Sequence, residues 1–265
     1  MTRFRPSLIS EWSKEAVRAK LGTKSSARPV LVQLPCRVVF IKVCGVTNSE
    51  DALLAAGLGA DAVGMIFAAS KRRITTGTAS DIVRHLPAET MAVGVFLDES
   101  RERVIKKANE VGLVAVQLHG SESIEDTRWL AARIPTVIKA FSATNSALRR
   151  AADYGAHHIL IDSAVPGSGK VFDWAVLEQA PSNLRFILAG GLNPRNVADA
   201  VTSVKPWGID VATGVEKSPG RKDAKKLRQF IAAARAAEPK VDEYLDNDDS
   251  PKPRPFNWEE DRSWR

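Results

Sequence analysis

Two side chains that can transfer protons stand directly after apolar runs of the kind that form buried β-strands. The run at residues 41–43 is followed by Cys44, and the run at residues 159–161 is followed by Asp162. A strand that ends in a thiol can hold a reactive sulfur where the backbone turns, and a carboxyl group in the same setting can donate a proton. The two residues predict a general base and a general acid that share one site.

Two further apolar runs end in glycine instead of a titratable side chain. One finishes at Gly190 and Gly191, and the other at Thr213 and Gly214. Because glycine has no side chain, backbone N–H groups there can approach an anion closely, and a following short helix adds its positive end. Together with the base and the acid, this pattern predicts an acid–base isomerisation of a phosphorylated small molecule.

Eight apolar, β-branched runs recur along the chain, with amphipathic stretches between them. The predicted strands are residues 38–43, 62–67, 92–97, 114–118, 137–141, 158–161, 186–189 and 209–211. The predicted helices include residues 49–58, 102–111, 124–133, 194–203 and 223–236. The strands start about 20–30 residues apart, which suits a strand, a loop and a helix in each unit.

Strict alternation of strands and helices leaves two architectures, a closed eight-stranded barrel or an open doubly wound sheet. An open sheet would concentrate unusual residues at one switch point, whereas here they follow the strands of most units. These residues are Cys44, Ser70 to Arg72, Asp98, His119, Asp162, Gly190, Gly191 and Gly214. The sequence therefore predicts an α/β protein with a single (β/α)8 TIM barrel.

The barrel is predicted to occupy residues 38–236 as one domain. Residues 1–37 carry several arginines and serines and form a predicted flexible N-terminal extension. A transit peptide is the alternative for this segment, against which Glu11 and Glu15 argue. Residues 237–265 form a predicted acidic and proline-rich tail, whose two tryptophans could dock on the barrel or on a partner.

The composition narrows the classes of partner. The net charge is +7, but the basic residues are scattered and only 6% of residues are aromatic, so no nucleic-acid partner is expected. A basic surface suits acidic small-molecule substrates. No apolar run approaches the ~18 residues of a membrane span, so no membrane partner is expected. Two cysteines are too few for a disulfide framework, which predicts a cytoplasmic location.

Six segments, in chain order and in register with the predicted strands, resemble the successive signatures of the phosphoribosylanthranilate isomerase family. They are residues 42–47 (KVCGVT), 70–74 (SKRRI), 116–120 (VQLHG), 161–163 with 169–174 (IDS, GKVFDW), 188–194 (LAGGLNP) and 208–216 (GIDVATGVE). The resemblance covers roughly residues 39–236. In two departures, Lys71 stands where many members have proline, and Ala212 with Thr213 replaces the more usual pair of serines. The second departure can alter one hydroxyl contact to phosphate.

The resemblance implies an aldose–ketose isomerase, an intramolecular oxidoreductase that needs neither a metal nor an organic cofactor. Its reaction converts N-(5-phospho-β-D-ribosyl)anthranilate into 1-(2-carboxyphenylamino)-1-deoxy-D-ribulose 5-phosphate by an Amadori rearrangement, the third step of tryptophan synthesis from chorismate. Asp162 would protonate the ring oxygen so that the sugar opens to an imine, and Cys44 would remove the proton from the sugar carbon beside the imine. A thiolate can do this when nearby positive charge or a helix dipole lowers the pKa of the thiol.

The resemblance also implies how the substrate is held. Arg72 matches the family residue that binds the anthranilate carboxylate, and a guanidinium fork can engage such an anion with two bonds, whereas Arg73 is expected to be a surface charge. The other predicted substrate-binding residues are His119, Gly190, Gly191, Asp210, Thr213 and Gly214. Two interpretations of His119 stay open, namely orienting substrate and satisfying a strand-end backbone group. Asp98 and Asp210 could instead steady loops or neighbouring polar groups. Both a monomer and a homodimer are possible.

Other functional classes use similar barrels. A Schiff-base aldolase needs a lysine at a strand end, and the one serious candidate, Lys139, lies in the interior of its predicted strand. The histidine-pathway isomerase performs the same rearrangement but characteristically uses two aspartates, and Cys44 fills the first of those positions. A phosphate-binding protein without catalysis would have no reason to keep Cys44, Asp162 and Arg72 together.

Overall fold

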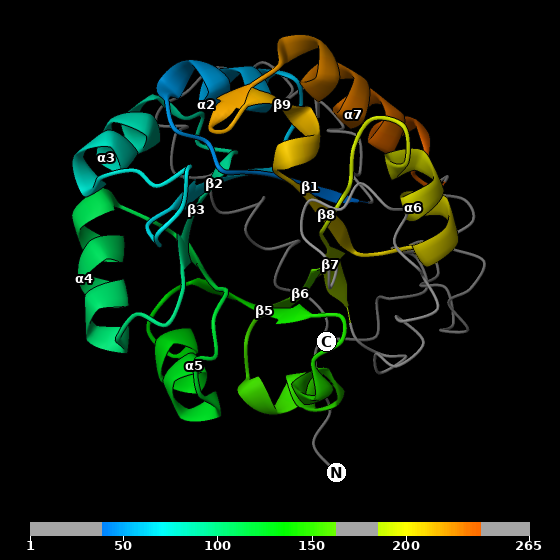
Figure 1. The fold of residues 1–265 in the computed structure, drawn as a ribbon. Coiled ribbons are helices and arrows are strands. Elements are labelled where there is room, and N and C mark those ends of the chain that lie inside the picture. The colour runs from blue at the N-terminus through cyan, green and yellow to red at the C-terminus, as the bar shows by residue number, and fades with distance from the viewer. Residues whose placement is uncertain (1–38, 163–184, 240–265) are drawn as a thin grey trace, which may run out of the picture. The chain divides into compact units, whose positions relative to one another are not determined.

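The computed structural model describes residues 39–162 and 185–239, and within them eight parallel strands close into a barrel. The strands are β1 (Phe40–Cys44), β2 (Ala62–Ile66), β3 (Met91–Phe96), β4 (Ala115–Leu118), β5 (Thr136–Ser142), β6 (His158–Asp162), β7 (Phe186–Leu188) and β8 (Gly208–Val211). Each strand pairs with its neighbours in chain order, and β8 pairs with β1 to close the ring (Figure 1). The predicted TIM barrel is confirmed.

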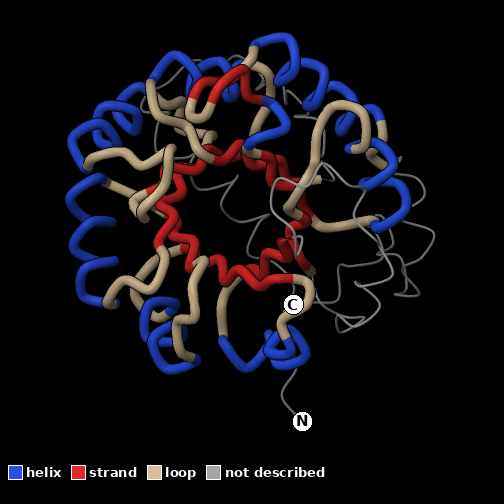
Figure 2. Tube along the Cα trace, viewed as in Figure 1, coloured by secondary structure: helices blue, strands red, loops and turns tan. Residues whose placement is uncertain are grey.

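Helices form an outer ring around the strands (Figure 2). They are the α-helices α2 (Ser49–Gly57), α3 (Thr76–His85), α4 (Arg101–Val111), α5 (Ile124–Ala131), α6 (Val197–Val204) and α7 (Ala224–Ala236), and the 3-10 helices η1 (Ser146–Tyr154) and η3 (Thr213–Val215). Asn48, Thr75, Ser100 and Ser123 each accept a hydrogen bond from a first-turn backbone N–H. These caps fix where four of the helices begin, because they satisfy donors that the helix itself cannot.

Two parts of the outer layer differ from the sequence prediction. The helix predicted from residue 194 begins at Val197, because Asn193 N donates to Asn196 Oδ1 at 2.8 Å and closes a turn before it. After β8, an antiparallel hairpin of β9 (Glu216–Ser218) and β10 (Arg221–Lys222) precedes α7. The sequence pattern did not predict this hairpin, because its charged residues carry no apolar alternation.

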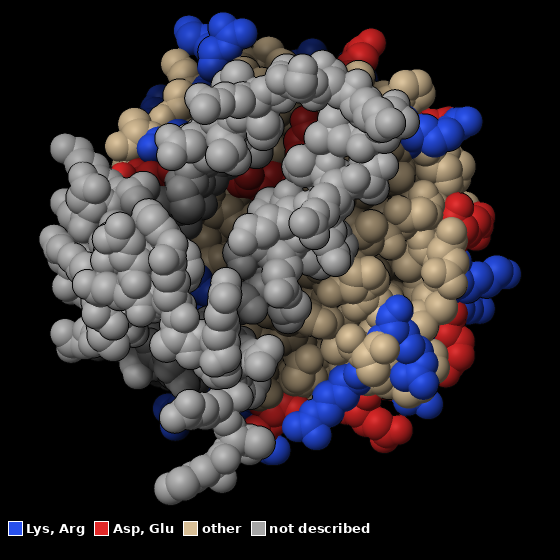
Figure 3. All heavy atoms as spheres, turned by 180° about the vertical axis from the view of Figure 1, so that it is seen from behind, with Lys and Arg blue, Asp and Glu red and all other residues tan. Residues whose placement is uncertain are grey.

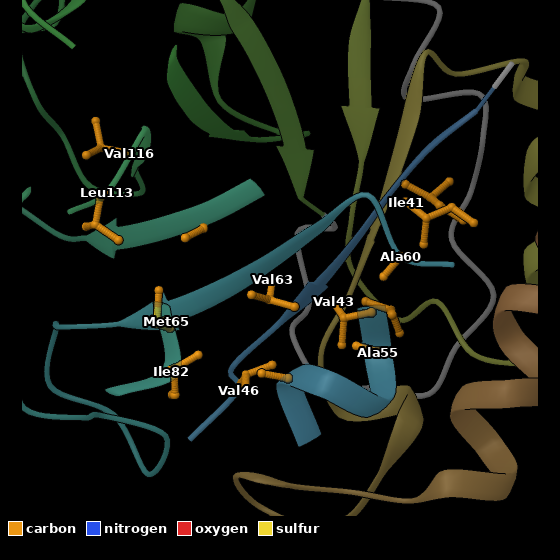
Figure 4. Packing of buried hydrophobic residues seen from close by; sticks show 14 of the residues in the cluster. Ile41, Val43, Val46, Ala55, Ala60, Val63, Met65, Ile82, Leu113 and Val116 are labelled. Carbon is orange, nitrogen blue, oxygen red and sulfur yellow. The ribbon is translucent and has the colours of Figure 1, made fainter. Parts of the chain in front are cut away.

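Side chains alternate along each strand between two cores. Ile41 and Val43 of β1 belong to the layer under the helices, and Figure 4 shows Val43 facing Ala55 of α2. The inner core contains Ala62, Val93, Ala115, Ile138, Ala140, Leu160, Ile187 and Ala189. Side chains two positions apart on a strand share a face. Cys44 and Asp162 therefore face the barrel interior at the carboxyl ends of their strands.

The strand boundaries agree with the prediction to within two residues, with one consequence for the site. Cys44 and Asp162 are the last residues of β1 and β6, not the first residues after them. Cys44 is the Cα partner of Gly64 on β2, and Asp162 is the Cα partner of Ser142 on β5. Both backbones are thus held by a neighbouring strand.

Several predictions concern residues outside the described part of the chain. The extension at residues 1–37, most of the tail at 237–265 and the motif at 169–174 all lie there, so the predicted domain boundaries stay predictions. No helix among the described residues is long and apolar enough to cross a membrane. On the face that Figure 3 shows, acidic and basic side chains of the described part are interspersed around its edge.

Candidate active site

Cys44 lies in a buried pocket of positive charge at the end of β1. Its side chain is 6% exposed, and the charges of Lys42 and Lys222 both act on the thiol. Burial has the largest effect on the pKa of the Cys44 thiol and raises it, the charge of Asp210 acts in the same direction, and the two lysines act to lower the pKa without reversing the net rise. The nearby positive charge that the proposed base requires is therefore present, but burial of the sulfur acts against it and the pKa of the thiol lies above its usual value.

Lys42 lies two residues before Cys44 on β1, so the two side chains share a face of the strand, and the Lys42 side chain is fully buried. Lys42 Nζ donates to Asp210 Oδ1 at 3.0 Å, and the two residues are Cα partners on β1 and β8. Asp210 is therefore occupied by an ion pair inside the barrel. Its predicted contact with substrate stays a prediction, whereas the alternative, that it steadies a neighbouring polar group, is what the geometry shows.

Asp162 has a different neighbourhood at the end of β6. His119 Nε2 lies 3.4 Å from Asp162 Oδ2, and His119 Nδ1 lies 2.7 Å from Gln117 Nε2. With the Gln117 amide nitrogen as donor, Nδ1 accepts, so the Nε2–H points to the carboxylate. The structure thus pairs His119 with two side chains, neither of which is the backbone group that one interpretation proposed.

Arg72 reaches the site from the loop after β2. Its Nε and Nη2 donate to the two oxygens of Glu216 at 2.8 and 2.7 Å, and Nη2 also lies 3.3 Å from Thr213 Oγ1. Arg72 is half-buried and Arg73 is exposed, in keeping with the predicted choice between them. Since Glu216 occupies the Nε–Nη2 edge, a substrate carboxylate would have to approach Nη1, which makes no hydrogen bond within the described residues.

A glycine makes room for this arginine. Gly45 has a φ of +72°, and a Cβ there would lie 2.5 Å from Arg72 Cδ. An alanine would therefore be strained by its backbone and would collide with the arginine stem. The glycine after the thiol serves the placement of Arg72 as well as the turn.

Glu216 and Lys222 were missed by the sequence reasoning as site residues. Lys222 Nζ donates to Cys44 O at 2.6 Å, Ala212 O at 3.2 Å and Glu216 Oε1 at 3.1 Å, so it ties the ends of β1 and β8 to the hairpin. Burial acts to raise the pKa of Glu216, but bonds from Arg72 and the charge of Lys222 bring it below its usual value. Glu216 ends the last of the six family-like segments, whereas no pattern marked Lys222.

The loops after β7 and β8 meet where the phosphate site was predicted. Gly190 and Gly191 have φ values of +87° and +68°, a conformation that suits glycine. A Cβ on Gly214 would lie 2.0 Å from Leu192 O, so the two loops touch through this glycine. Asn196 Nδ2 donates to Gly191 O at 3.1 Å and holds the first loop.

Two other predicted residues have structural partners. Asp98 has a φ of +50° and accepts from Ser121 N at 2.6 Å, so it steadies its loop. Lys139 is buried in the middle of β5, where Nζ lies 3.0 Å from Glu122 Oε2. Its side chain shares a face with Phe141 in the outer core, away from Ile138 and Ala140 of the inner core. This position removes the lysine from the barrel interior, where a Schiff base would form.

Comparison with known proteins decides the family. A family model described as N-(5'phosphoribosyl)anthranilate (PRA) isomerase matches residues 41–233. The chain belongs to this isomerase family. An N-(5'-phosphoribosyl)anthranilate isomerase from Thermotoga neapolitana is 46% identical over 204 residues, which are 75% of this chain and 99% of that protein.

Solved structures of the family agree with the barrel described above. The crystal structure of phosphoribosyl anthranilate isomerase from Thermotoga maritima is 43% identical, with a TM-score of 0.69 over 75% of this chain and 99% of that one. A second isomerase structure, in complex with reduced 1-(o-carboxyphenylamino)-1-deoxyribulose 5-phosphate, is 41% identical with a TM-score of 0.67, over 75% of this chain and 99% of that one. All the predicted site residues of the chain lie inside the span that matches the family model.

Among the described residues, no group of three or more His, Cys, Asp or Glu side chains could hold a metal ion. The titratable groups of the site form pairs instead, with Lys42 on Asp210, Arg72 on Glu216 and His119 on Asp162. Such an arrangement can move protons and hold anions.

Proposed function

We propose that this member of the isomerase family converts N-(5-phosphoribosyl)anthranilate into 1-(2-carboxyphenylamino)-1-deoxyribulose 5-phosphate. The observation that carries the proposal is the placement of Cys44 and Asp162 at the carboxyl ends of β1 and β6, both facing the barrel interior. The carboxyl ends of the strands are where (β/α)8 barrels hold their chemistry. The identity of the substrate is inferred from the family to which the chain belongs.

Asp162 acts as the general acid in the proposed reaction. Its proton goes to the ring oxygen of the sugar, the bond between the ring oxygen and the anomeric carbon breaks, and an imine forms with the anthranilate nitrogen. Asp162 is then a carboxylate, and the Nε2–H of His119, 3.4 Å from Oδ2, can stabilise it. His119 thus supports the acid, in addition to the predicted contact with substrate.

Cys44 acts as the general base in the second step. Its thiolate removes the proton from the sugar carbon beside the imine and gives an enol amine. The enol amine becomes the ketose product when the anomeric carbon takes up a proton and the hydroxyl group on the neighbouring carbon loses one. Burial raises the pKa of the Cys44 thiol, and only the thiolate can take up the proton, so the rate is expected to depend on how well the site stabilises the thiolate. Lys222 holds the Cys44 backbone through its bond to the carbonyl oxygen.

The two anionic groups of the substrate have separate proposed sites. The phosphate binds to the loops of Gly190, Gly191, Thr213 and Gly214, where backbone N–H groups can surround an anion. The anthranilate carboxylate binds Arg72 through Nη1, with Glu216 holding the other edge of the guanidinium group. Fixing both ends of the molecule would align the opened sugar between the acid and the base.

The experiment that tests the proposal is a fluorescence assay in which purified protein consumes phosphoribosylanthranilate. We expect turnover with the full-length chain and loss of turnover in Cys44→Ala and Asp162→Asn. No turnover by the folded wild-type protein would overturn the proposal and leave a binding protein as the better interpretation.

Two further properties of the chain stay proposals. A monomer and a homodimer are both compatible with the family, since the isomerase from Thermotoga maritima is described as dimeric and as yielding monomers. Sedimentation of the purified protein would distinguish the two states. The cytoplasmic location rests on the low cysteine content alone.

A further inference from the structure

Lys42 is a buried charge that the proposed reaction does not use. Its side chain is fully buried inside the barrel, where an ammonium group is costly unless it is paired. It lies two residues before Cys44 on β1, so both side chains face the interior. A lysine in this position needs a physical reason, since an apolar side chain would fill the barrel at lower cost.

The geometry places the Lys42 ammonium group beside the Cys44 sulfur. Gly64 on β2 is the Cα partner of Cys44. A Cβ on Gly64 would lie 2.8 Å from Cys44 Sγ and 3.1 Å from Lys42 Nζ. The two atoms thus border the same small space over a glycine. Burial raises the pKa of the Cys44 thiol, and the charge of Lys42 is the largest effect that acts to lower it.

Asp210 holds the ammonium group at this position. Its Oδ1 lies 3.0 Å from Lys42 Nζ, and its backbone is in register with Lys42 across the β1–β8 pair. We propose that Lys42 is a positioning residue for the proposed base, with an ammonium group that stabilises the Cys44 thiolate while Asp210 fixes that ammonium group in place. This inference rests on the proposed role of Cys44.

The charge balance around the sulfur supports the proposal. Lys42 from β1, Asp210 from β8, Lys222 from β10 and Arg72 from the loop after β2 all act on Cys44 electrostatically, and Glu216 from β9 pairs with the last two cations. Three cations face two anions, so a thiolate would make this cluster neutral. When the thiolate takes the proton from the sugar carbon it becomes a thiol, and Lys42 keeps its own proton throughout.

Lys42 and Lys222 differ in what they contact. Lys222 Nζ donates to the backbone oxygen of Cys44 and to Glu216, so its main contacts are structural. Lys42 Nζ instead borders the same space over Gly64 as the Cys44 sulfur. Of the two cations, Lys42 also has the larger charge effect on the Cys44 pKa.

The test is the titration of the thiolate by its ultraviolet absorbance, in full-length protein that carries Cys36→Ala so that Cys44 is the one remaining cysteine. We expect Lys42→Met to move the midpoint of the Cys44 titration up by about one to two pH units. The thiolate fraction at neutral pH then falls about 10- to 100-fold, and kcat falls by a similar factor with little change in KM. Lys42→Arg keeps the charge and should restore most of the titration midpoint.

Lys139→Met is the matched control. Lys139 is also a buried strand lysine that is paired with a carboxylate, but its side chain lies on the outer face of the barrel strands, away from the interior. It should leave the Cys44 midpoint unchanged. A folded Lys42→Met protein with a wild-type midpoint, or an equal shift in Lys139→Met, would overturn the proposal. If Lys42→Met does not fold, Lys42→Gln, whose amide can still donate to Asp210, replaces it with the same expected and contradicting results. The titration needs no substrate, so its outcome is independent of whether the proposed substrate is correct.

Discussion

The two ends of the barrel interior carry different chemistry on the same two strands. β1 begins at Phe40 and ends at Cys44, and β6 begins at His158 and ends at Asp162. At the amino ends, the rings of Phe40 and His158 both stack on Trp207, with centroids 4.9 and 4.1 Å away. At the carboxyl ends, the same strands present a thiol and a carboxyl group.

The difference indicates that the amino end of the barrel contributes mainly to stability and the carboxyl end mainly to activity. The aromatic end buries ring surface and makes stacked contacts, which stabilise the closed sheet. The carboxyl end gathers buried charges that desolvation disfavours, and such groups are typical of functional sites. Substitutions at the carboxyl end should therefore change the rate more than the fold, and substitutions at the amino end should do the reverse.

The largest expected effect is that of Cys44→Ala on turnover. Removing a general base should lower kcat by about 10²–10⁴, with a small change in KM. The thermal midpoint should change little, because the side chain is small and alanine keeps the strand backbone. Steady-state kinetics and a thermal melt on the same preparation check both halves of the expectation.

Cys36→Ala is the matched control for this substitution, and it should retain wild-type kcat. Near-wild-type turnover in Cys44→Ala would remove the thiol from the mechanism. A large loss of thermal stability in the same variant would instead contradict the division between the two ends.

Arg72→Ala should have the next largest effect, and that effect should appear in KM. The lost charge-assisted contact to the anthranilate carboxylate is worth roughly 1.5–3 kcal/mol, or about 10- to 100-fold in KM. Kinetics of Arg72→Ala and Arg73→Ala compared side by side provide the check, because Arg73 is exposed. If Arg73→Ala raises KM and Arg72→Ala does not, the substrate carboxylate binds the other arginine.

A smaller effect is expected at the amino end, in the dependence of stability on pH. Burial, together with the smaller effects of the charges of His157 and Arg185, lowers the pKa of His158 to about 4. Between an unfolded-state pKa of about 6.5 and this value, the unfolded chain binds the proton first, so the free energy of unfolding falls as the pH falls through that window. The full loss is on the order of 2–3 kcal/mol.

Denaturant unfolding at several pH values between about 4 and 7 measures this loss. His158→Phe, which keeps a ring on Trp207 but cannot take up a proton, should flatten the dependence and leave kcat unchanged. An equally steep dependence in His158→Phe would assign the effect to other groups.

Much of the framework could be predicted from the sequence, because apolar runs report strands directly. Cys44 and Asp162 were found because each interrupts such a run at its end. Lys42 and Gln117 also face the barrel interior, but they were not identified as site residues. A polar residue inside a strand looks like a solvent-facing residue in an alternating pattern. Arg72 and Glu216 are 144 residues apart in the chain, and only the closed barrel brings them together.

The net shift of the Cys44 pKa also depended on the structure. A thiolate base needs nearby positive charge or a helix dipole to lower the pKa of the thiol, but the burial that opposes this effect follows from packing across β1, β2 and β8. The hairpin of β9 and β10 could not be predicted either, since its role comes from the contacts of Glu216 and Lys222 with other strands.

The pH profile of Asp162→Asn is the measurement that decides whether a thiol on β1 and a carboxyl group on β6 act as base and acid in one reaction. Wild-type kcat/KM should rise with pH as the thiolate forms and fall at higher pH, provided that product release does not mask the chemistry. Asp162→Asn keeps the size of the side chain but cannot donate an acidic proton, so kcat should fall sharply while ligand binding persists. Its residual kcat/KM should rise with pH toward the pKa of the thiol and show no fall beyond it. A variant with wild-type kcat and both limbs of the profile would exclude Asp162 as the acid and make His119 the next candidate.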